Sequence, residues 1–302
     1  MTGTMSTSAA PAAQGGDAHA QRDPLVIAHR GDSLVAPENT MAAFAAAAAG
    51  GADMIEIDLH MSADGEGIVI HDGTVDRTTD ASGAVGDLDV AEIARFDAGS
   101  WFDPAFGGQH VPLIGDVLEL LERHPRVRLL LEFKDPWDEG PLRRVLGEIQ
   151  DAGLAERVLV QSFFPPVLQT LRTHATEIPR GLIATRFDEQ VLATCAELDV
   201  VACNPRHTLV AADPQIVDQV HAAGLQIMVW TPNEPEQWEP LVAAGVDGII
   251  TDRPDRLRGF LQVRDGAHSS SSAPSEVPAT GDGQVPAGGR GPVPAGAQAA
   301  QG

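Results

Sequence analysis

Residues 129–160 read LLLEFKDPWDEGPLRRVLGEIQDAGLAERVLV, and this segment indicates the fold. An apolar run of strand length, Leu129–Phe133, comes first, and apolar residues then recur at helical spacing over Leu142–Ala152. A second short apolar run, Val158–Val160, follows. A helix between two such strands is typical of a βαβ unit, whose strands lie parallel in one sheet. The segment therefore predicts a parallel sheet covered by helices.

The same alternation recurs along the chain. The predicted strands are Leu25–Ala28, Met54–Leu59, Leu129–Phe133, Val158–Val160, Leu182–Ala184, Val200–Ala202, Gln226–Trp230 and Gly248–Ile250. The predicted helices are Asn39–Ala49, Ile114–Arg123, Leu142–Ala152, Pro166–His174, Glu189–Leu198, Pro214–Ala223 and Pro235–Ala244. Eight strands in this arrangement favour an α/β fold of the (β/α)8 TIM-barrel type, with an open doubly wound sheet as the alternative.

One segment interrupts the alternation. After Met54–Leu59, the turn sequence SADG at residues 62–65 leads to a further apolar run, Ile68–Ile70, which predicts a hairpin with a return strand. Residues 73–111 then contain no clear partner strand, and a segment of this length in a compact domain is usually functional. We expect a small insertion on top of the barrel. Its candidate anchors are Phe96, Trp101, Phe102 and Phe106.

The two ends of the chain differ from its middle. Residues 1–23 are mostly small and polar, and residues 266–302 are rich in Pro, Gly, Ala and Ser. Neither end has enough apolar side chains to offset the entropy of ordering, so both are predicted to be disordered tails. The folded domain is then residues 24–265, close to the ~250 residues typical of a (β/α)8 barrel.

The composition limits the possible partners. The chain has 43 acidic and 20 basic side chains, a formal charge of −23, which argues against nucleic acid or an anionic membrane as partner. A small anionic substrate remains compatible, because a metal ion or a few cations can dominate one pocket. The two cysteines cannot form a disulfide scaffold, no apolar run is long enough to cross a bilayer, and the first residues lack the apolar core of a signal peptide. We expect a soluble, cytoplasmic protein without stable membrane insertion.

Carboxylates gather at the predicted strand ends, which carry the active site in a parallel barrel. Glu56 and Asp58 are two residues apart and so point to the same face of their strand, and Glu132 stands at the matching height of the next strand. Three carboxylates without cysteine suit Ca²⁺ or Mg²⁺ better than zinc. The alternative is that Glu56 or Asp58 caps a turn or pairs with Arg30.

Two cations lie beside these carboxylates. Lys134 is the only lysine of the chain, and a compact ammonium suits a phosphate oxygen. Arg30 follows the first strand directly and can bind the same oxygens through two N–H groups. The alternative for Lys134 is a chance residue on a solvated loop. The charges of the three carboxylates, a divalent ion, the two cations and one phosphodiester cancel.

His29 and His71 are the candidate proton carriers. Both end a predicted strand at the same mouth, and an imidazole with a pKa near ~6.5 can either accept or donate a proton. Asp72 could orient His71 or stabilise the return strand. Trp230, at another strand end, is a candidate wall for an apolar part of a substrate, or a core residue. Glu38 could reach the site, although its neighbours Asn39 and Thr40 are candidate helix N-caps.

The series of motifs resembles the glycerophosphodiester phosphodiesterases, from about residue 25 to 255. The matching motifs are His29-Arg30-Gly31, Pro37-Glu38-Asn39-Thr40, Glu56-Ile57-Asp58, His71-Asp72, Asp76-Arg77-Thr78-Thr79, Val111-Pro112-Leu113, Leu131-Glu132-Phe133-Lys134, Gln161-Ser162-Phe163 and Trp230-Thr231-Pro232-Asn233. The resemblance implies a TIM barrel that hydrolyses glycerophosphodiesters to glycerol 3-phosphate and an alcohol. Residues 62–65 and Pro232 depart from the family's usual pattern, which puts loop detail and substrate choice in doubt.

The resemblance also implies roles for individual residues. A divalent ion would bind to Glu56, Asp58 and Glu132, and Arg30 and Lys134 would hold the phosphate. His29 and His71 would carry out acid–base catalysis. We assign the acid to His29 and the base to His71, and leave open whether water or a hydroxyl of the glycerol is the nucleophile.

Two other functions fit the same barrel. A phosphodiesterase of lysophospholipids or other lipids would need an apolar entry surface, for which the candidates are Trp101, Phe102 and Phe106. A barrel that binds phosphate esters without catalysis is the second alternative, although every expected catalytic residue is present.

Overall fold

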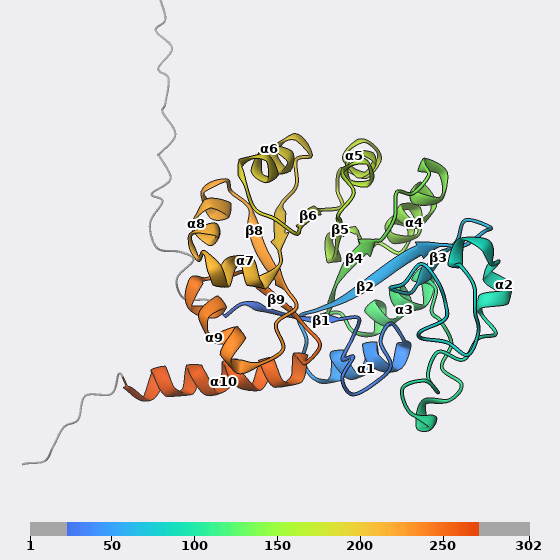
Figure 1. Ribbon diagram of the computed structural model, residues 1–302, viewed down its shortest axis with the longest axis horizontal. Coiled ribbons are helices and arrows are strands. Elements are labelled where there is room, and N and C mark those ends of the chain that lie inside the picture. The colour runs from blue at the N-terminus through green and yellow to red at the C-terminus, as the bar shows by residue number, and fades with distance from the viewer. Residues whose placement is uncertain (1–22, 272–302) are drawn as a thin grey trace, which may run out of the picture. The chain divides into compact units, whose positions relative to one another are not determined.

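The computed structural model describes the backbone of residues 23–271 and the side chains of residues 23–264. Eight parallel strands form a barrel with the helices on its outside (Figure 1). Neighbouring strands follow the order β1-β9-β8-β7-β6-β5-β4-β2, and β1 also pairs with β2, which closes the barrel. The predicted (β/α)8 fold is confirmed, and the open sheet is excluded.

The strands are β1 (Leu25–His29), β2 (Met54–Met61), β3 (Gly67–Val69), β4 (Arg128–Phe133), β5 (Val158–Ser162), β6 (Arg180–Ala184), β7 (Ala202–Pro205), β8 (Gln226–Trp230) and β9 (Gly248–Thr251). The α-helices are α1 (Met41–Ala49), α2 (Val90–Ile93), α3 (Ile114–Arg123), α4 (Glu139–Asp151), α5 (Pro165–His174), α6 (Glu189–Glu197), α7 (His207–Ala212), α8 (Gln215–Ala222), α9 (Pro235–Ala244) and α10 (Pro254–Ser271). Short 3-10 helices are η1 (Val85–Asp87), η2 (Pro104–Phe106) and η3 (Ala155–Arg157).

The chain divides into two units after Arg264. The barrel lies in the first unit, and residues 265–271 of the second continue α10. The disorder predicted for residues 1–22 and 272–302 lies outside the described residues. Within residues 23–271, no helix combines the length and apolar character that crossing a bilayer requires.

Strand β7 is displaced from its predicted position. The apolar residues Val200 and Val201 suggested a strand over Val200–Ala202, whereas β7 is Ala202–Pro205. Val201 is 42% exposed and precedes the strand, while the polar residue Asn204 is fully buried within it. Helices α7 and α10 were also not predicted.

The strand register explains why charged residues meet at one end of the barrel. His29 of β1 stands opposite Glu56 of β2, and Asp58 of β2 stands opposite Glu132 of β4. Beneath them the barrel interior is apolar, filled by Ile27, Met54, Leu130, Leu159, Ala202, Met228 and Ile250. A layer of apolar side chains thus separates the charged end of the barrel from its opposite end.

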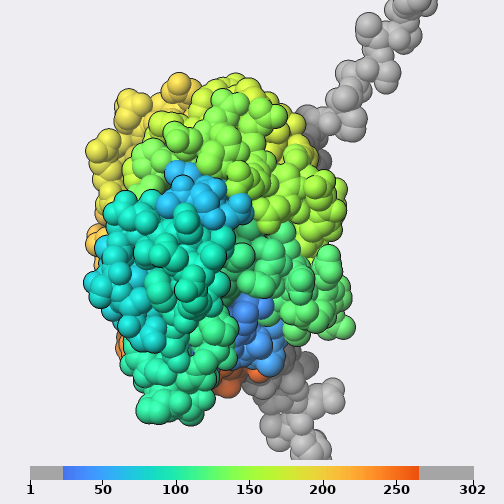
Figure 2. Space-filling view, turned by 90° about the vertical axis from the view of Figure 1, so that its right-hand side faces the viewer, coloured from blue at the N-terminus to red at the C-terminus, as the bar shows by residue number. Residues whose placement is uncertain are grey.

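The insertion has a core of its own around the β2–β3 hairpin. Strand β3 runs antiparallel to the end of β2, and the insertion's apolar residues pack beside it. This cluster consists of Ile68, Ile70, Val75, Val85, Ile93, Ala98 and Val111, with Phe96 packed against it. Figure 2 shows the insertion, in teal, as a continuous area of one face beside the tip of the hairpin, in blue.

The other predicted aromatic anchors behave differently from Phe96. Phe102 makes edge-on contacts with Trp101 at 5.7 Å and with Phe106 at 5.6 Å between ring centres. Trp101 is 39% exposed. These three rings therefore form a second, more superficial cluster rather than an anchor in the insertion's core.

Candidate active site

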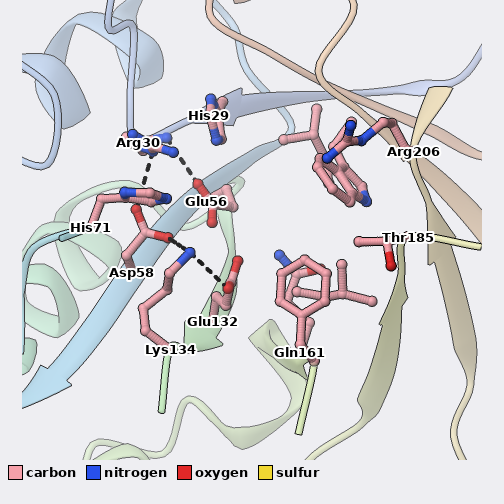
Figure 3. A pocket seen from close by; sticks show the side chains of 14 residues that line it. His29, Arg30, Glu56, Asp58, His71, Glu132, Lys134, Gln161, Thr185 and Arg206 are labelled. Atoms are coloured by element: carbon pink, nitrogen blue, oxygen red, sulfur yellow. Dashed lines mark hydrogen bonds and ion pairs between the residues drawn. The ribbon is translucent and has the colours of Figure 1, made fainter. Parts of the chain in front are cut away.

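A cavity of about 240 Å³ opens at the C-terminal ends of the strands (Figure 3). Eight of the nine predicted site residues line it: His29, Arg30, Glu56, Asp58, His71, Glu132, Lys134 and Trp230. The ninth, Glu38, lies behind Arg30 and does not line the cavity. The structure therefore brings eight of the predicted residues together at one mouth, and Glu38 reaches this mouth through its contact with Arg30.

The three predicted metal ligands lie together. Glu56, Asp58 and Glu132 are 1%, 1% and 6% exposed, and each offers an oxygen within 4.8 Å of an oxygen of the others. Burial and the charges of Asp58 and Glu132 hold the pKa of Glu56 well above its usual range. Burial and the charge of Asp58 likewise raise the pKa of Glu132 to about 7. The cluster thus concentrates negative charge that a cation would stabilise.

Arg30 and Lys134 stand on either side of Asp58. Arg30 Nε lies 3.2 Å from Asp58 Oδ2, and Lys134 Nζ lies 3.3 Å from Asp58 Oδ1 and 2.9 Å from Glu132 Oε1. Burial opposes the ionisation of Asp58, but the two cations outweigh it and hold its pKa well below the usual range. Figure 3 shows these side chains converging from β1, β2 and β4.

The turn after β1 depends on Gly31. Arg30 and Gly31 both have positive φ angles, +58° and +85°, and the Arg30 N–H donates to Glu56 Oε2 at 3.0 Å. A Cβ atom on Gly31 would stand 2.7 Å from the backbone of Ala43, so only glycine fits there. This explains the His-Arg-Gly sequence at the end of the first strand.

The donor set fits a hard divalent cation. It consists of three carboxylates from two neighbouring strands, without sulfur or imidazole, and one oxygen of each lies within 4.8 Å of the others beside the cavity. Ca²⁺ and Mg²⁺ both prefer such oxygen ligands. The buried acidic cluster can therefore bind a metal ion.

His29 is fixed by a residue that the sequence analysis left without a role. Its Nδ1 lies 2.6 Å from Asp252 Oδ1, just after β9, and Asn233 Nδ2 donates to the other Asp252 oxygen at 2.5 Å. Burial would raise the pKa of Asp252, but the contacts with His29 and Asn233 and the charge of Arg30 together outweigh it and keep the pKa below its ordinary value. An ionised carboxylate only accepts, so Nδ1 of His29 carries a proton and Nε2 is left for the cavity.

His71 has the same kind of support. Its Nδ1 lies 2.7 Å from Asp72 Oδ1, and its backbone carbonyl lies 2.9 Å from His60 Nε2. Burial, chiefly, lowers the pKa of His71. Asp72 therefore orients His71, one of the two roles considered for it, because its carboxylate contacts the imidazole.

Glu38 and Arg77 connect the two sides of this site. Arg77, from the insertion, donates to Asp72 Oδ2 at 2.7 Å and through two N–H groups to Glu38, each at 2.8 Å. Glu38 also accepts from Arg30 NH1 at 2.8 Å. A chain of charged hydrogen bonds thus joins His71 to Arg30 through Arg77.

Asn39 also belongs to the site. Thr40, rather than Asn39, caps α1, since its side chain accepts from Ala43 N. Asn39 adopts a φ of +53° and donates from Nδ2 to Asp58 Oδ2 at 2.8 Å. The sequence had offered both Asn39 and Thr40 as the cap, and Thr40 is correct. It contained no local sign that Asn39 contacts Asp58.

The wall of the cavity opposite the carboxylates combines aromatic rings with a cation. Trp230, at the end of β8, contacts Phe163 edge-on at 5.8 Å, and the Arg206 guanidinium lies 4.9 Å from the centre of the Trp230 ring. Gln161, Ile183, Thr185 and Ile250 also line the cavity. Trp230 is therefore a wall residue, whereas the positions of Phe163 and Arg206 were not predicted.

Comparison with known proteins identifies the family. The model of the glycerophosphoryl diester phosphodiesterase family matches residues 29–256. The chain belongs to this family. A glycerophosphodiester phosphodiesterase of Caldanaerobacter subterraneus subsp. tengcongensis is 35% identical over 239 residues, which cover 79% of this chain and 98% of that protein. The family that the motif series indicated is thus confirmed, and with it the prediction of a phosphoric diester hydrolase.

Solved structures of the family have the same fold. A glycerophosphodiester phosphodiesterase of Agrobacterium tumefaciens is 32% identical, with a TM-score of 0.69 over 78% of this chain and 99% of that one. A phosphodiesterase of Oleispira antarctica, in complex with the product sn-glycerol-3-phosphate, is 28% identical, with a TM-score of 0.72 over 80% of this chain and 97% of that one.

Proposed function

We propose that this protein hydrolyses glycerophosphodiesters to glycerol 3-phosphate and an alcohol, in a reaction that depends on Ca²⁺ or Mg²⁺ and on His29 and His71. The observation that carries this proposal is one cavity that combines three buried carboxylates, two cations and two histidine–aspartate pairs. A phosphodiester is anionic and has a poor alkoxide leaving group, so its hydrolysis needs both charge neutralisation and a proton.

Glu56, Asp58 and Glu132 would hold the divalent ion. When bound, the ion supplies Lewis-acid polarisation of a phosphoryl oxygen. Lys134 and Arg30 stand beside the same carboxylates and would bind the remaining phosphate oxygens. Arg30 presents its guanidinium for two hydrogen bonds, and Glu38 fixes its direction from behind, so we assign Glu38 a positioning role.

The surroundings of the histidines support our division of roles. Burial lowers the pKa of His71, which favours the neutral imidazole that a general base needs. Asp252 accepts from Nδ1 of His29 and offsets the positive charge of the imidazolium that a general acid needs. Nε2 of His71 would take a proton from the nucleophile, water or a glycerol hydroxyl, and Nε2 of His29 would protonate the departing alcohol.

The remaining parts of the site would set the substrate. Trp230 offers an apolar face to a substrate carbon chain. The lipid-phosphodiesterase alternative has less support, because Trp101, Phe102 and Phe106 pack on one another and are not among the residues that line the cavity. Cytoplasmic location and the absence of a nucleic-acid partner stay predictions from charge and composition.

A substrate panel tests the proposed function. The purified protein, with Ca²⁺ and Mg²⁺ in separate reactions, is incubated with glycerophosphocholine, glycerophosphoethanolamine or lysophosphatidylcholine, and both products are quantified. We expect glycerol 3-phosphate and the free alcohol in equal amounts from the first two, and only slow turnover of the third. Preferred cleavage of lysophosphatidylcholine would favour the lipid alternative, and tight binding without products would favour a binding protein.

A further inference from the structure

Arg206 is a cation of the cavity wall to which the proposed chemistry gives no task. It follows β7 directly and lines the cavity on the side opposite the carboxylate cluster, as Figure 3 shows. Its guanidinium lies over the Trp230 ring, 4.9 Å from the ring centre. Stacking of this kind orients a guanidinium and leaves its N–H groups available at the edges.

The Trp230 ring on which Arg206 rests is itself held in place. Trp230 Nε1 donates to the backbone oxygen of Asn204 at 2.8 Å, and Phe163 packs edge-on against the ring. Nδ1 of His207 lies 3.1 Å from the Trp230 backbone oxygen. The ring therefore forms a fixed platform, and Arg206 keeps its charge at a defined place beside the cavity.

Arg206 differs from the other two cations of the cavity in its partners. Arg30 pairs with Glu38 and Asp58, and Lys134 pairs with Asp58 and Glu132. For Arg206, the described residues provide no carboxylate within 4.0 Å and no acceptor for its side-chain N–H groups. In a chain with 43 acidic and 20 basic side chains, a cation without an acidic partner at the cavity wall points to an anionic ligand.

We propose that Arg206 forms a subsite for an anionic group on the second alcohol of the substrate, and that the enzyme prefers glycerophosphodiesters whose alcohol bears a carboxylate or phosphate. This inference rests on the proposed function and adds to it the charge of the second alcohol that the enzyme prefers. The phosphodiester lies at the carboxylate cluster, and the second alcohol extends along Trp230 until its anionic group meets the Arg206 guanidinium.

Three esters that differ in charge but hardly in size test the inference. Their second alcohols are glycolate, ethylene glycol and ethanolamine, which are negative, neutral and positive. For the wild type we expect kcat/KM to fall in that order. In Arg206→Met, kcat/KM for the glycolate ester should fall by about tenfold, as expected on loss of a charge-assisted contact, and that for the neutral ester by less than about twofold. Arg206→Glu should reverse the order, and Arg206→Lys should keep it.

Other results would overturn the inference. Equal kcat/KM values for the three wild-type esters would do so. An equal loss for all three in Arg206→Met would mean that Arg206 contacts the glycerol or the phosphate, which also contradicts it. If the wild type hydrolyses none of the esters, the proposed function fails, and calorimetric dissociation constants for the same esters and variants then decide the charge preference by themselves.

Discussion

Asp58 is almost completely buried and nevertheless ionised, because Arg30, Lys134 and Asn39 all face its carboxylate. Glu132 differs from it, since Lys134 and the charge of Arg30 do not offset burial and the charge of Asp58, and its pKa rises to about 7. Without a metal ion, the cluster therefore retains a proton at mildly acidic pH. Individual side chains thus make the charge of the site depend on pH.

Metal binding should consequently depend on pH. Below about pH 7 a proton occupies Glu132 in the metal-free protein, the raised pKa of Glu56 favours a proton there as well, and a cation has to displace them. The affinity for Ca²⁺ or Mg²⁺ should fall as the pH falls, by about tenfold per pH unit for each proton displaced. Calorimetric titrations at pH 6 and pH 8, in two buffers with different ionisation enthalpies, measure affinity and proton release. The same affinity at both pH values, without proton release, would argue against this picture.

The two histidines should be essential for turnover but not for folding. Removal of a general acid or base typically costs ~10²–10⁴ in rate, and we expect losses of this size in kcat for His29→Ala and His71→Ala. Both side chains are partly exposed, so the melting temperature should change little. His110→Ala is the control, because His110 is exposed and does not line the cavity. Near-normal kcat in both variants would refute the assignment.

Residues at strand ends were easier to predict from the sequence than the partners that hold them. His29 and His71 were predicted because each follows an apolar run directly. The partner of His29, Asp252, lies 223 positions further along the chain, and only closure of the barrel brings the two together. No local pattern contains that information.

The insertion contributes to the site through Arg77, a single side chain. Its core packs on the β2–β3 hairpin, and Arg77 extends from it to Asp72 and Glu38. Hydrogen bonds to the two carboxylates fix its direction, although the side chain is 43% exposed. The element therefore acts as a brace beside the cavity, and its residues do not form the cavity wall.

Loss of this brace should affect catalysis more than stability. Arg77→Met removes the contacts that orient Asp72 and Glu38, and we expect kcat to fall by about tenfold, while the free energy of unfolding changes by about 1 kcal/mol or less, as for exposed ion pairs. Arg77→Lys should recover part of the rate. Arg95→Met is the matched control, because Arg95 lies in the same insertion and binds only the Ala91 carbonyl. Equal effects of Arg77→Met and Arg95→Met on kcat would exclude a positioning role.

Elements with a strong periodicity were predicted well, and those with mixed polarity were not. Strand β8 and helices α3 and α9 have the predicted bounds: β8 and α3 show a clear pattern, and α9 begins at Pro235 and ends before Gly245. Strand β7 was displaced because its buried residue Asn204, which donates to Gln161 of the next strand but one, β5, interrupted the apolar run. The insertion consists of turns and very short helices, which are too short to show a hydrophobic periodicity in the sequence.

At the scale of the whole barrel, the site lies where the sheet closes. His29 is on β1, Glu56 and Asp58 are on β2, and Glu132 is on β4, so a bound ion would join two strands next to the β1–β2 pairing. The fold itself was predictable, because parallel strands covered on both faces appear as apolar runs separated by helices. The repulsion between Glu56, Asp58 and Glu132 was not predictable in this way, because it depends on how closely the folded barrel brings the three carboxylates together.

A bound ion should therefore stabilise the protein against heat. At a concentration one hundred times Kd, a ligand of the native state adds about 2.7 kcal/mol, which for a domain of this size raises Tm by roughly 5–10 °C. Differential scanning calorimetry with Ca²⁺, Mg²⁺ or EDTA measures this shift. In Glu132→Gln the shift should be much smaller, and an equal shift in that variant would place the ion elsewhere.

Titration of metal into the chelated enzyme, with release of glycerol 3-phosphate as the readout, examines the proposed site and its chemistry together. Our account predicts no release in EDTA, restored release on addition of Ca²⁺ or Mg²⁺, and no restoration at any concentration in Asp58→Asn. Undiminished release in EDTA, or full restoration in Asp58→Asn, would contradict it.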